Sequence, residues 1–405
     1  MSRGHKKQQD QNAPISVARS LSDIDLPDVA GLGVHKESEL NIRSAMLDDI
    51  TQLVALENAS FESDRLSQRR FMHWLKAADS HRVFMVATHN DVLLGYGLVI
   101  MRKGTRLARL YSIAVSRQAR GLGVGKKLLL ALEQNTLEQD KLFMRLEVAT
   151  NNTGAIKLYE SLGYRTFGTY ANYYQGSIDA LRMQKPIRQS LSLQTLPTYP
   201  WYQQTTEFTC GPSSLMMAMA NLNPKLDMSQ SLELDIWRQA TTIFMTSGHG
   251  GCHPIGLALA AHQLGFSVTA YVNTKAPLFI DGVRSEHKKY IMQAVDRQFL
   301  QQAKAQGIKI IYTDPDVNAL QTGLAKGAAV ISLISTYQLD GKKIPHWVTV
   351  THIDEDCLYL HDPDPDDLHP QPMDCQHIPI ARGDFFRLSA FGKSKLRTAL
   401  LISKK

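Results

Sequence analysis

Glycines occupy alternate positions of the segment 121–125, between a strand-like stretch around Ile113 and Val115 and an amphipathic helix over about residues 123–139. Glycine lets the backbone approach a bound anion closely, and the amides at the start of a helix attract negative charge. The order of strand, glycine loop and helix therefore predicts a site for a phosphate or pyrophosphate group.

Two widespread phosphate loops do not fit this segment. The dinucleotide pattern requires a third glycine at the position of Lys126, and no ribose-binding acid follows at the expected place. The nucleoside triphosphate loop requires Ser or Thr after Gly-Lys, but Gly125-Lys126 is followed by Lys127. Both nucleotide-binding patterns are therefore excluded.

Two side chains able to move protons follow the glycine segment. Glu147 lies in a strand whose apolar residues alternate over 142–148, so it projects from the opposite face. Tyr159 lies on a short helix that begins after Asn152 and ends at Gly163. A carboxylate can accept a proton and a phenol can donate one, as acyl transfer to an amine requires. From spacing alone, Glu147 could equally be an exposed strand carboxylate and Tyr159 a half-buried packing residue.

The segments around these residues resemble the GNAT superfamily of acyltransferases. Gln118-Ala119-Arg120-Gly121-Leu122-Gly123 resembles its Gln/Arg-x-x-Gly-x-Gly/Ala signature, which binds the pyrophosphate of acetyl-CoA. The ribosomal-protein alanine N-acetyltransferases of this superfamily are similar in the order and spacing of further segments: Ile113-Ala114-Val115, Leu146-Glu147-Val148 and Asn152 to Tyr164. The resemblance covers roughly residues 40–185.

This resemblance implies a fold, a cofactor and roles for individual residues. The fold is the α/β GNAT fold, the cofactor is acetyl-CoA, and the acceptor is a peptide or protein with a free amine. Glu147 is implied as the proton acceptor, through a water molecule, and Tyr159 as the donor to the CoA thiolate. The implied contacts to acetyl-CoA are Ile113, Ala114, Val115, Arg120, Gly121, Leu122, Gly123, Val124, Gly125, Lys126 and Asn152.

The second half of the chain contains a candidate nucleophile, Cys210, directly ahead of an apolar helix with Pro212 in its first turn. The N-terminus of a helix favours the thiolate form of a cysteine. His346 opens a strand-like segment and Asp362 ends the next one, so a carboxylate can orient an imidazole that serves the thiol. Gln204, six residues before Cys210, can donate to a developing oxyanion. Each residue alone has an ordinary structural interpretation, whereas the four together predict a thiol reaction centre.

These four residues resemble the site of the papain-like, bacteriocin-processing cysteine peptidases, which commonly trim leader peptides after a double glycine. The matching elements are Gln204 ahead of Cys210-Gly211, the strand His346-Trp347-Val348-Thr349-Val350, and Asp362-Pro363, sixteen residues after His346. The resemblance covers about residues 197–400 and implies a papain-like fold.

The elements that position the two sites follow from periodicity. His89-Asn90-Asp91 is a hairpin signal between two strand-like runs. The second half has helices over about 212–221 and 254–264, followed by apolar strand-like runs at 329–335, 347–353 and 358–361, which predicts an α+β domain. Cys210 and His346 are 136 residues apart. This separation is longer than is usual in the papain-like group that the segment resembles, so the resemblance implies an insertion, around Ser231–Phe244 or Phe279–Ala303, that covers or reshapes the cleft.

Two clusters that could hold a metal ion are better interpreted otherwise. His249, Cys252 and His253 lack a fourth zinc ligand and are typical of a glycine-rich loop that enters the helix at Pro254. The acidic segment 362–367 lacks the glycine and the terminal glutamate of the standard calcium loop. No metal site is predicted.

Length and composition limit the classes of function. The chain has 405 residues, which predicts two domains. Its formal charge of +7 and pI near 9.1 come from scattered Lys and Arg, so no nucleic-acid partner is predicted. The four cysteines have no paired spacing, which argues against a disulfide framework and indicates a reducing compartment.

The chain is predicted to be a cytoplasmic protein with four parts. Residues 1–39 are polar and lack the apolar core of a secretion signal, so they are interpreted as a flexible leader. No apolar run of about 18 residues suggests a membrane span. A GNAT domain over 40–185, a linker rich in Ser, Gln, Thr and Pro over 186–202, and a papain-like domain over 203–405 follow.

The sequence therefore predicts a bifunctional enzyme, an acetyl-CoA-dependent N-acetyltransferase joined to a cysteine peptidase, both acting on peptides or proteins. Two alternatives stay open for the C-terminal half. It could be a papain-like module that binds peptides without cleaving them, or a thiol-dependent amidase or acyl transferase, because the same four residues would serve that chemistry.

Overall fold

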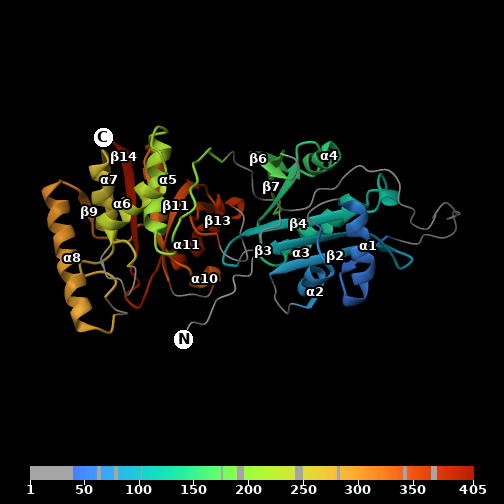
Figure 1. Cartoon of the computed structure of the whole chain (residues 1–405), viewed down its shortest axis with the longest axis horizontal. Helices are drawn as coiled ribbons and strands as arrows, with labels where there is room; N and C mark the ends of the chain where they lie inside the picture. Colours follow the sequence, from blue (N-terminus) through green and yellow to red (C-terminus); the bar gives the residue numbers. More distant parts are fainter. Residues whose placement is uncertain are drawn as a thin grey trace, which may run out of the picture. The chain divides into compact units, whose positions relative to one another are not determined.

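The computed structural model describes residues 40–61, 65–76, 81–101, 103–174, 177–188, 196–241, 250–280, 283–340, 344–365 and 372–405. The predicted leader and His249 lie outside these ranges. The chain forms two compact units that divide between Thr195 and Leu196, and each unit is built on one seven-stranded sheet (Figure 1). None of the helices in the described ranges has the length and apolar character that a bilayer crossing requires.

The sheet of the first unit has the strand order β1-β2-β3-β4-β5-β7-β6. Its strands are β1 (Asn41–Ser44), β2 (Arg82–His89), β3 (Val92–Met101), β4 (Leu107–Val115), β5 (Phe143–Ala149), β6 (Arg165–Tyr174) and β7 (Ile178–Pro186). Neighbouring strands are antiparallel except β4 and β5, which are parallel. Asn90 and Asp91 form the turn between β2 and β3 with φ of 48° and 61°, as a two-residue hairpin requires. The predicted hairpin is confirmed.

Helices cover both faces of this first sheet. One face packs against the core that includes Leu53 of α1 and Phe71 of α2, and the other against the core that includes Leu128 of α3 and Tyr159 of α4. The helices are α1 (Ile50–Ser60), α2 (Gln68–Lys76), α3 (Val124–Leu137) and α4 (Thr153–Ser161), with short 3-10 turns η1 (Leu47–Asp49) and η2 (Arg117–Ala119). Both faces are therefore apolar over much of the sheet.

The parallel strands β4 and β5 are paired over only part of their length. The pairs run from Leu107 opposite Phe143 to Arg109 opposite Arg145. Beyond Arg109, β4 pairs with β3 alone as far as Val115, and β5 pairs with β7 alone. The two strands therefore separate toward their carboxyl ends, which leaves one side of the end of β4 without a strand partner.

The sheet of the second unit has the order β13-β12-β11-β10-β14-β8-β9. Its strands are β8 (Phe266–Val272), β9 (Lys309–Ile311), β10 (Ala329–Ser335), β11 (Pro345–Ile353), β12 (Cys357–His361), β13 (Ile378–Ala381) and β14 (Thr398–Lys404). All neighbouring pairs are antiparallel except β8 and β9. The predicted strand-like runs at 329–335, 347–353 and 358–361 correspond to β10, β11 and β12.

Helices also cover both faces of the second sheet. Helix α5 packs on β10 and β11, α7 packs beside α5 and α6, and the long α8 lies on the outer side of α7 (Figure 1). The opposite face packs against α9 and α11. The helices are α5 (Cys210–Leu222), α6 (Gln230–Ala240), α7 (Pro254–Gln263), α8 (Glu286–Ala305), α9 (Val317–Ala325), α10 (Tyr337–Asp340) and α11 (Arg382–Leu388), with the 3-10 turn η3 (Pro372–Cys375).

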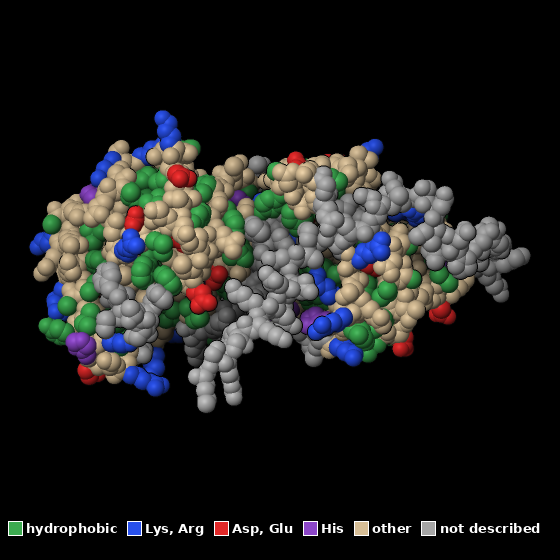
Figure 2. Space-filling model, in the orientation of Figure 1, with side chains coloured by type: hydrophobic (Ala, Val, Ile, Leu, Met, Phe, Trp, Pro, Cys, Tyr) green, Lys and Arg blue, Asp and Glu red, His purple; other side chains and the backbone are tan. Residues whose placement is uncertain are grey.

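Basic side chains are distributed over the surface in small groups. On the face shown in Figure 2, Lys and Arg side chains are separated by other residues and do not merge into one patch. The scattered positions of Lys and Arg in the sequence correspond to this distribution.

Gly256 is expected to be essential for the packing of α7. A Cβ at Gly256 would lie 2.7 Å from the Cα and 2.9 Å from the carbonyl oxygen of Ala240, the last residue of α6. Backbone atoms cannot move aside as a flexible side chain can, so Gly256→Ala should lower the free energy of unfolding by about 1–3 kcal/mol. Urea unfolding of the full chain measures this change.

Gly383→Ala provides the matched control, because a Cβ at Gly383 in α11 would meet no atom within 4 Å. Its stability should stay the same or rise by up to about 1 kcal/mol. Equal effects of the two substitutions would contradict the close contact between α6 and α7.

Candidate active sites

The glycine segment forms an open turn at the start of α3. Gly121 and Gly123 adopt φ of 81° and 76°, and a Cβ on either residue would meet no atom within 4 Å. Gly123 is the N-cap residue of α3 and has no side chain that could cap the amides of Val124–Lys126. These amides and the positive end of the helix lie beside open space, so the residues present fit a pyrophosphate group.

The other predicted cofactor contacts lie where β4 and β5 separate. Ile113, Ala114 and Val115 follow the last pair between the two strands, so among the described strands β3 alone neighbours their backbone. Asn152 is the N-cap residue of α4, and its side chain accepts a hydrogen bond from the amide of Ala155 at 3.2 Å. The structure thus gives Asn152 a capping role, and its contact with a cofactor stays a prediction.

Glu147 lies on β5, beyond the last pair between β4 and β5, and is paired with an arginine. Its Oε2 atom is 2.7 Å from Nη2 and 2.9 Å from Nε of Arg109 on β4. Tyr174 donates a hydrogen bond to the backbone carbonyl of Glu147, and Arg109 also donates to the hydroxyl of Tyr173. Arg109 was not predicted as a site residue, because nothing in the spacing indicates a pairing across 38 residues.

Tyr159 lies on α4 and belongs to the core between α3 and the sheet. Its ring centre is 5.7 Å from that of Tyr164. Burial, and in second place the charge of Glu147, raise the pKa of Tyr159 well above its ordinary value. The phenol is therefore protonated at neutral pH, and its electrostatic coupling to Glu147 places the two predicted proton carriers in the same region.

Cys210 is the first residue of α5, and hydrogen bonds fix this helix against β11. Ser214 donates from its hydroxyl to the backbone carbonyl of Trp347 at 3.0 Å, and Thr349 donates to the carbonyl of Ser214 at 3.0 Å. Gly211 permits the close approach, since a Cβ there would lie 3.2 Å from the indole of Trp347. These contacts bring the start of α5, and with it the thiol, to the start of β11.

His346 on β11 connects the thiol to a carboxylate. Its Nε2 atom is 2.8 Å from Oδ1 of Asp362, and Cys210 lies near enough to influence the charge of the ring. Burial alone would lower the pKa of His346, but Asp362 and Cys210 together raise it well above the ordinary value. The arrangement therefore favours a charged imidazolium beside the sulfur. All three side chains are nearly buried, which strengthens the interaction.

Gln204 lies beside the carboxylate. Its backbone N–H donates to the carbonyl of Pro363 at 2.9 Å, and Trp201 donates to the carbonyl of Asp362 at 2.9 Å. Gln204 is nearly buried, and within the described ranges its Oε1 atom has no hydrogen-bond partner. The structure thus brings Cys210, His346 and Asp362 into one connected group, with the backbone of Gln204 attached next to Asp362.

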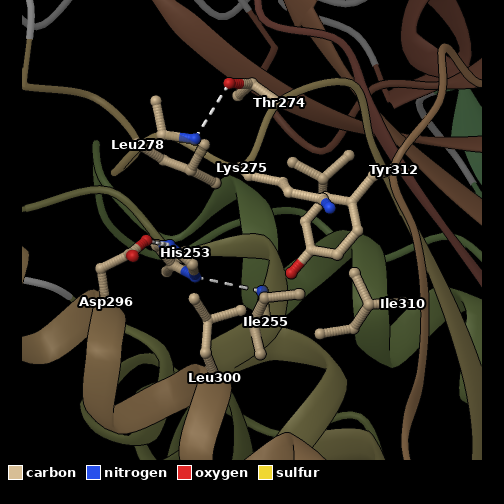
Figure 3. A pocket seen from close by; sticks show the side chains of 11 residues that line it. His253, Ile255, Thr274, Lys275, Leu278, Asp296, Leu300, Ile310 and Tyr312 are labelled. Atoms are coloured by element: carbon tan, nitrogen blue, oxygen red, sulfur yellow. Dashed lines mark hydrogen bonds and ion pairs between the residues drawn. The ribbon is translucent and has the colours of Figure 1, made fainter.

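The two clusters that are interpreted as something other than metal sites have interactions with the protein. Figure 3 shows His253 between Asp296 and Ile255, beside a pocket. The Nε2 atom of His253 is 2.9 Å from Oδ1 of Asp296, and its Nδ1 atom accepts from the backbone amide of Ile255 at 3.1 Å. Both ring nitrogens are thus engaged by the protein. In the acidic segment, Asp362 is engaged by His346, and residues 366 and 367 lie outside the described ranges.

The predicted insertion segments correspond to two helices and their neighbours. Ser231–Phe244 includes most of α6, whose Glu233 contacts the segment that precedes Cys210. Phe279–Ala303 includes most of α8, whose Asp296 bonds His253. Glu233 was not predicted as a site residue, although the buried positions 233, 236 and 240 of α6 form one stripe in which a carboxylate is conspicuous.

Two family models match separate parts of the chain. Residues 47–164 match the Acetyltransferase (GNAT) family, which makes the first unit a GNAT acetyltransferase domain with the GNAT fold. Residues 199–403 match a family described as Peptidase_C39 like.

Relatives and solved structures resemble the N-terminal part. An N-alpha-acetyltransferase of Sulfurisphaera tokodaii is 28% identical over 163 residues, 38% of this chain and 96% of the relative. A [ribosomal protein bS18]-alanine N-acetyltransferase of Salmonella typhimurium is 39% identical over 83 residues, 20% of this chain and 56% of the relative. The solved ribosomal-protein-S18-alanine N-acetyltransferase of Escherichia coli is 25% identical, covers 40% of this chain and 100% of its own, and has a TM-score of 0.34.

Asp362→Asn is expected to change how stability depends on pH. Burial opposes protonation of His346, and the Asp362 carboxylate is the strongest charge that favours it, so the substitution should lower the pKa of His346. A histidine with a raised folded-state pKa stabilises the protein fully below the unfolded value of about 6.5, and this stabilisation is lost as pH rises through the folded pKa. The loss of stability in the variant should therefore be largest in mildly acidic solution and smallest at alkaline pH, as measured by urea unfolding.

Asp235→Asn is the control, because Asp235 is more than half exposed and its ion-pair partner, Arg238, is exposed too. Its effect on stability should be within about 0.5 kcal/mol at each pH. A stability loss in Asp362→Asn that does not vary with pH would contradict the charge coupling to His346.

Proposed function

The chain belongs to the Peptidase_C39 like family, whose model matches residues 199–403. We propose that it is a bifunctional enzyme, a cysteine peptidase joined to an acetyl-CoA-dependent N-acetyltransferase. In this proposal the acetyltransferase occupies residues 40–185, a linker covers 186–202, and a papain-like peptidase domain covers 203–405. Both centres act on peptides or proteins.

The observation that carries the peptidase proposal is the connected group of Cys210, His346 and Asp362. The bond of 2.8 Å between His346 and Asp362 orients the imidazole, and Cys210 is coupled electrostatically to the same ring. This is the arrangement that an activated nucleophile requires, a base beside the nucleophile and a third group that orients the base. The start of α5 adds its positive end to the stabilisation of a thiolate.

In the proposed reaction, the Cys210 thiolate attacks the carbonyl carbon of a peptide bond and forms a C–S bond. The oxygen of that carbonyl becomes negative, and the side-chain amide of Gln204 donates a hydrogen bond to it. The imidazolium of His346 gives its proton to the leaving amine as the C–N bond breaks. Water, deprotonated by the same imidazole, then cleaves the thioester to a carboxylate and restores the thiol.

The proposal for the first unit is that the open glycine turn holds acetyl-CoA, the acyl donor of GNAT acetyltransferases. The amides of Arg120–Lys126 would hold its pyrophosphate, and the unpaired side of Ile113–Val115, with Asn152, would hold the rest of the cofactor. When bound, acetyl-CoA supplies an activated acetyl thioester.

The chain's own residues would manage the protons of this transfer. The Glu147 carboxylate, fixed by Arg109, would accept through water the proton that an acceptor ammonium must lose before it can react. The Tyr159 hydroxyl, which its raised pKa keeps protonated, would hold the proton that a departing thiolate requires.

The two reactions can follow one another on one substrate. Cleavage by the second unit exposes a new N-terminal amine, and acetylation by the first unit blocks it. The product would be a trimmed peptide with an acetylated N-terminus.

Glu147→Gln should lower kcat for peptide acetylation by about 100-fold or more, because the variant loses the proton acceptor. Tyr159→Phe should lower kcat by a similar factor, because it loses the proton donor. Both should bind acetyl-CoA nearly as well as the unchanged protein in calorimetry, since neither residue is assigned to cofactor binding. Mass spectrometry of a peptide library with free N-termini measures the acetylation rate.

The control for Glu147→Gln is Glu160→Gln, since Glu160 is an exposed residue of α4. It should acetylate within about twofold of the unchanged protein. Full activity of Glu147→Gln would remove that residue from the proposed proton path.

Cys210→Ala should abolish cleavage of the peptide library, including peptides with a double glycine, and leave acetylation unchanged. Cys375→Ala, which removes another buried cysteine, is the control and should retain cleavage. Both activities are read in one mass-spectrometric assay. If the unchanged protein acetylates but never cleaves, the second unit is a peptide-binding module; if it releases ammonia or an acyl-transfer product, it is an amidase or acyl transferase.

A further inference from the structure

A wholly buried carboxylate, that of Glu233, lies beside the thiol site of the second unit. Glu233 has 0% of its surface exposed, and Ile236 and Ala240 are the other buried residues of α6. A carboxylate on the apolar side of a helix is costly unless hydrogen bonds compensate for the lost water. The hydrogen-bond donors around Glu233 therefore show which part of the chain its carboxylate holds in place.

Five donors from one segment, Tyr202–Ser213, converge on this carboxylate. Two donate to Oε2, the hydroxyl of Tyr202 at 3.0 Å and that of Thr205 at 2.8 Å. Three donate to Oε1: the backbone N–H of Thr205 at 2.8 Å, the hydroxyl of Ser213 at 3.2 Å, and the hydroxyl of Thr209. All five are neutral groups, so hydrogen bonds and the positive start of α5 balance the buried charge.

In the sequence, these donors flank the two residues of the segment that are assigned to the reaction, Gln204 and Cys210. Tyr202 and Thr205 lie on either side of Gln204, and Thr209 and Ser213 lie on either side of Cys210. One carboxylate therefore fixes the backbone next to the amide and the backbone next to the thiol at the same time. The bond between the Gln204 N–H and Pro363 and the bond from Trp201 to Asp362 attach the same segment on the side of the carboxylate.

We propose that Glu233 is a positioning residue of the thiol site, which sets the distance between the Gln204 amide and the Cys210 sulfur so that the amide meets the oxyanion. This inference rests on the proposed function of the second unit. Glu233 contacts neither the substrate carbonyl nor the thiol in this role, and it acts through Gln204. Glutamine has the same shape as glutamate but cannot replace it here. Its NH2 group donates hydrogen bonds, so it would face the donors that now bond one carboxylate oxygen and could not accept from them.

Two reactions of the same sulfur separate this role from a general role in folding. Alkylation of Cys210 by iodoacetamide displaces iodide and forms no oxyanion, so it depends on the thiol and imidazole alone. Acylation of Cys210 by p-nitrophenyl acetate forms an oxyanion and depends on the donor as well. A residue that positions the donor affects only the second reaction, whereas a residue that supports the whole fold affects both.

The experiment compares both rates in the full-length chain with Glu233→Gln. The burst of p-nitrophenolate, one equivalent per Cys210, should slow by about 100-fold. Alkylation, followed by intact mass, should change by less than about threefold. Glu286→Gln, which alters an 85% exposed carboxylate, is the matched control and should leave both rates unchanged.

A double variant tests whether Glu233 acts through Gln204. In Gln204→Ala, adding Glu233→Gln should slow the burst by less than about threefold further, because the donor to the oxyanion is already gone.

Thr205→Val provides a second variant if Glu233→Gln does not fold, since it removes one hydroxyl donor at nearly constant volume. It should slow the burst by about tenfold and leave alkylation nearly unchanged. Equal losses in both reactions, an unchanged burst, or full additivity with Gln204→Ala would overturn the proposal. If the unchanged protein gives no burst at Cys210, the proposed thiol function fails, and this inference fails with it; a normal burst in both proteins overturns the inference alone.

Discussion

The fixed contact between the start of α5 and the start of β11 is the constraint on which the thiol site depends. The reciprocal bonds between Ser214 and β11, with Gly211 against Trp347, hold a helix N-terminus against a strand end. Cys210 and His346 are 136 residues apart in the sequence and become neighbours only through this contact. Strand β12 is the antiparallel neighbour of β11 and ends at His361, so the next residue, Asp362, lies beside the start of β11 and bonds His346. Burial strengthens each of these electrostatic interactions and makes the group act as a unit.

In the first unit, the proposed site depends on the incomplete pairing of the two parallel strands β4 and β5. Where β4 and β5 separate, one strand has unpaired backbone and the other carries Glu147, while α3 starts nearby with uncapped amides. A binding site for a long, anionic thioester and a site for proton transfer thus arise from the same irregularity of the sheet. The ion pair between Arg109 and Glu147 connects the two separating strands through their side chains.

Local patterns in the sequence predicted the local features of the structure. The Asn90-Asp91 turn and the strands that carry Glu147 and His346 follow from turn preferences and periodicity, as does the helix expected over about 212–221, which begins two residues earlier, at Cys210. The resemblance of two short motifs indicated both reaction centres, and the family matches support the GNAT domain and a Peptidase_C39 like region. Periodicity did not predict the partners of site residues that lie far away along the chain. Arg109 with Glu147, and Glu233 with the segment before Cys210, are pairings between elements that no local pattern connects.

The charge state of His346 at neutral pH tests the central claim most directly. In a protein labelled with isotopic nitrogen in its histidines, NMR distinguishes an imidazolium, with both ring nitrogens protonated, from a neutral ring. The account predicts an imidazolium in the free protein and loss of that proton at a lower pH once Cys210 has been alkylated, since the sulfur then carries no charge. A neutral ring that does not respond to alkylation would contradict a coupled thiol and imidazole.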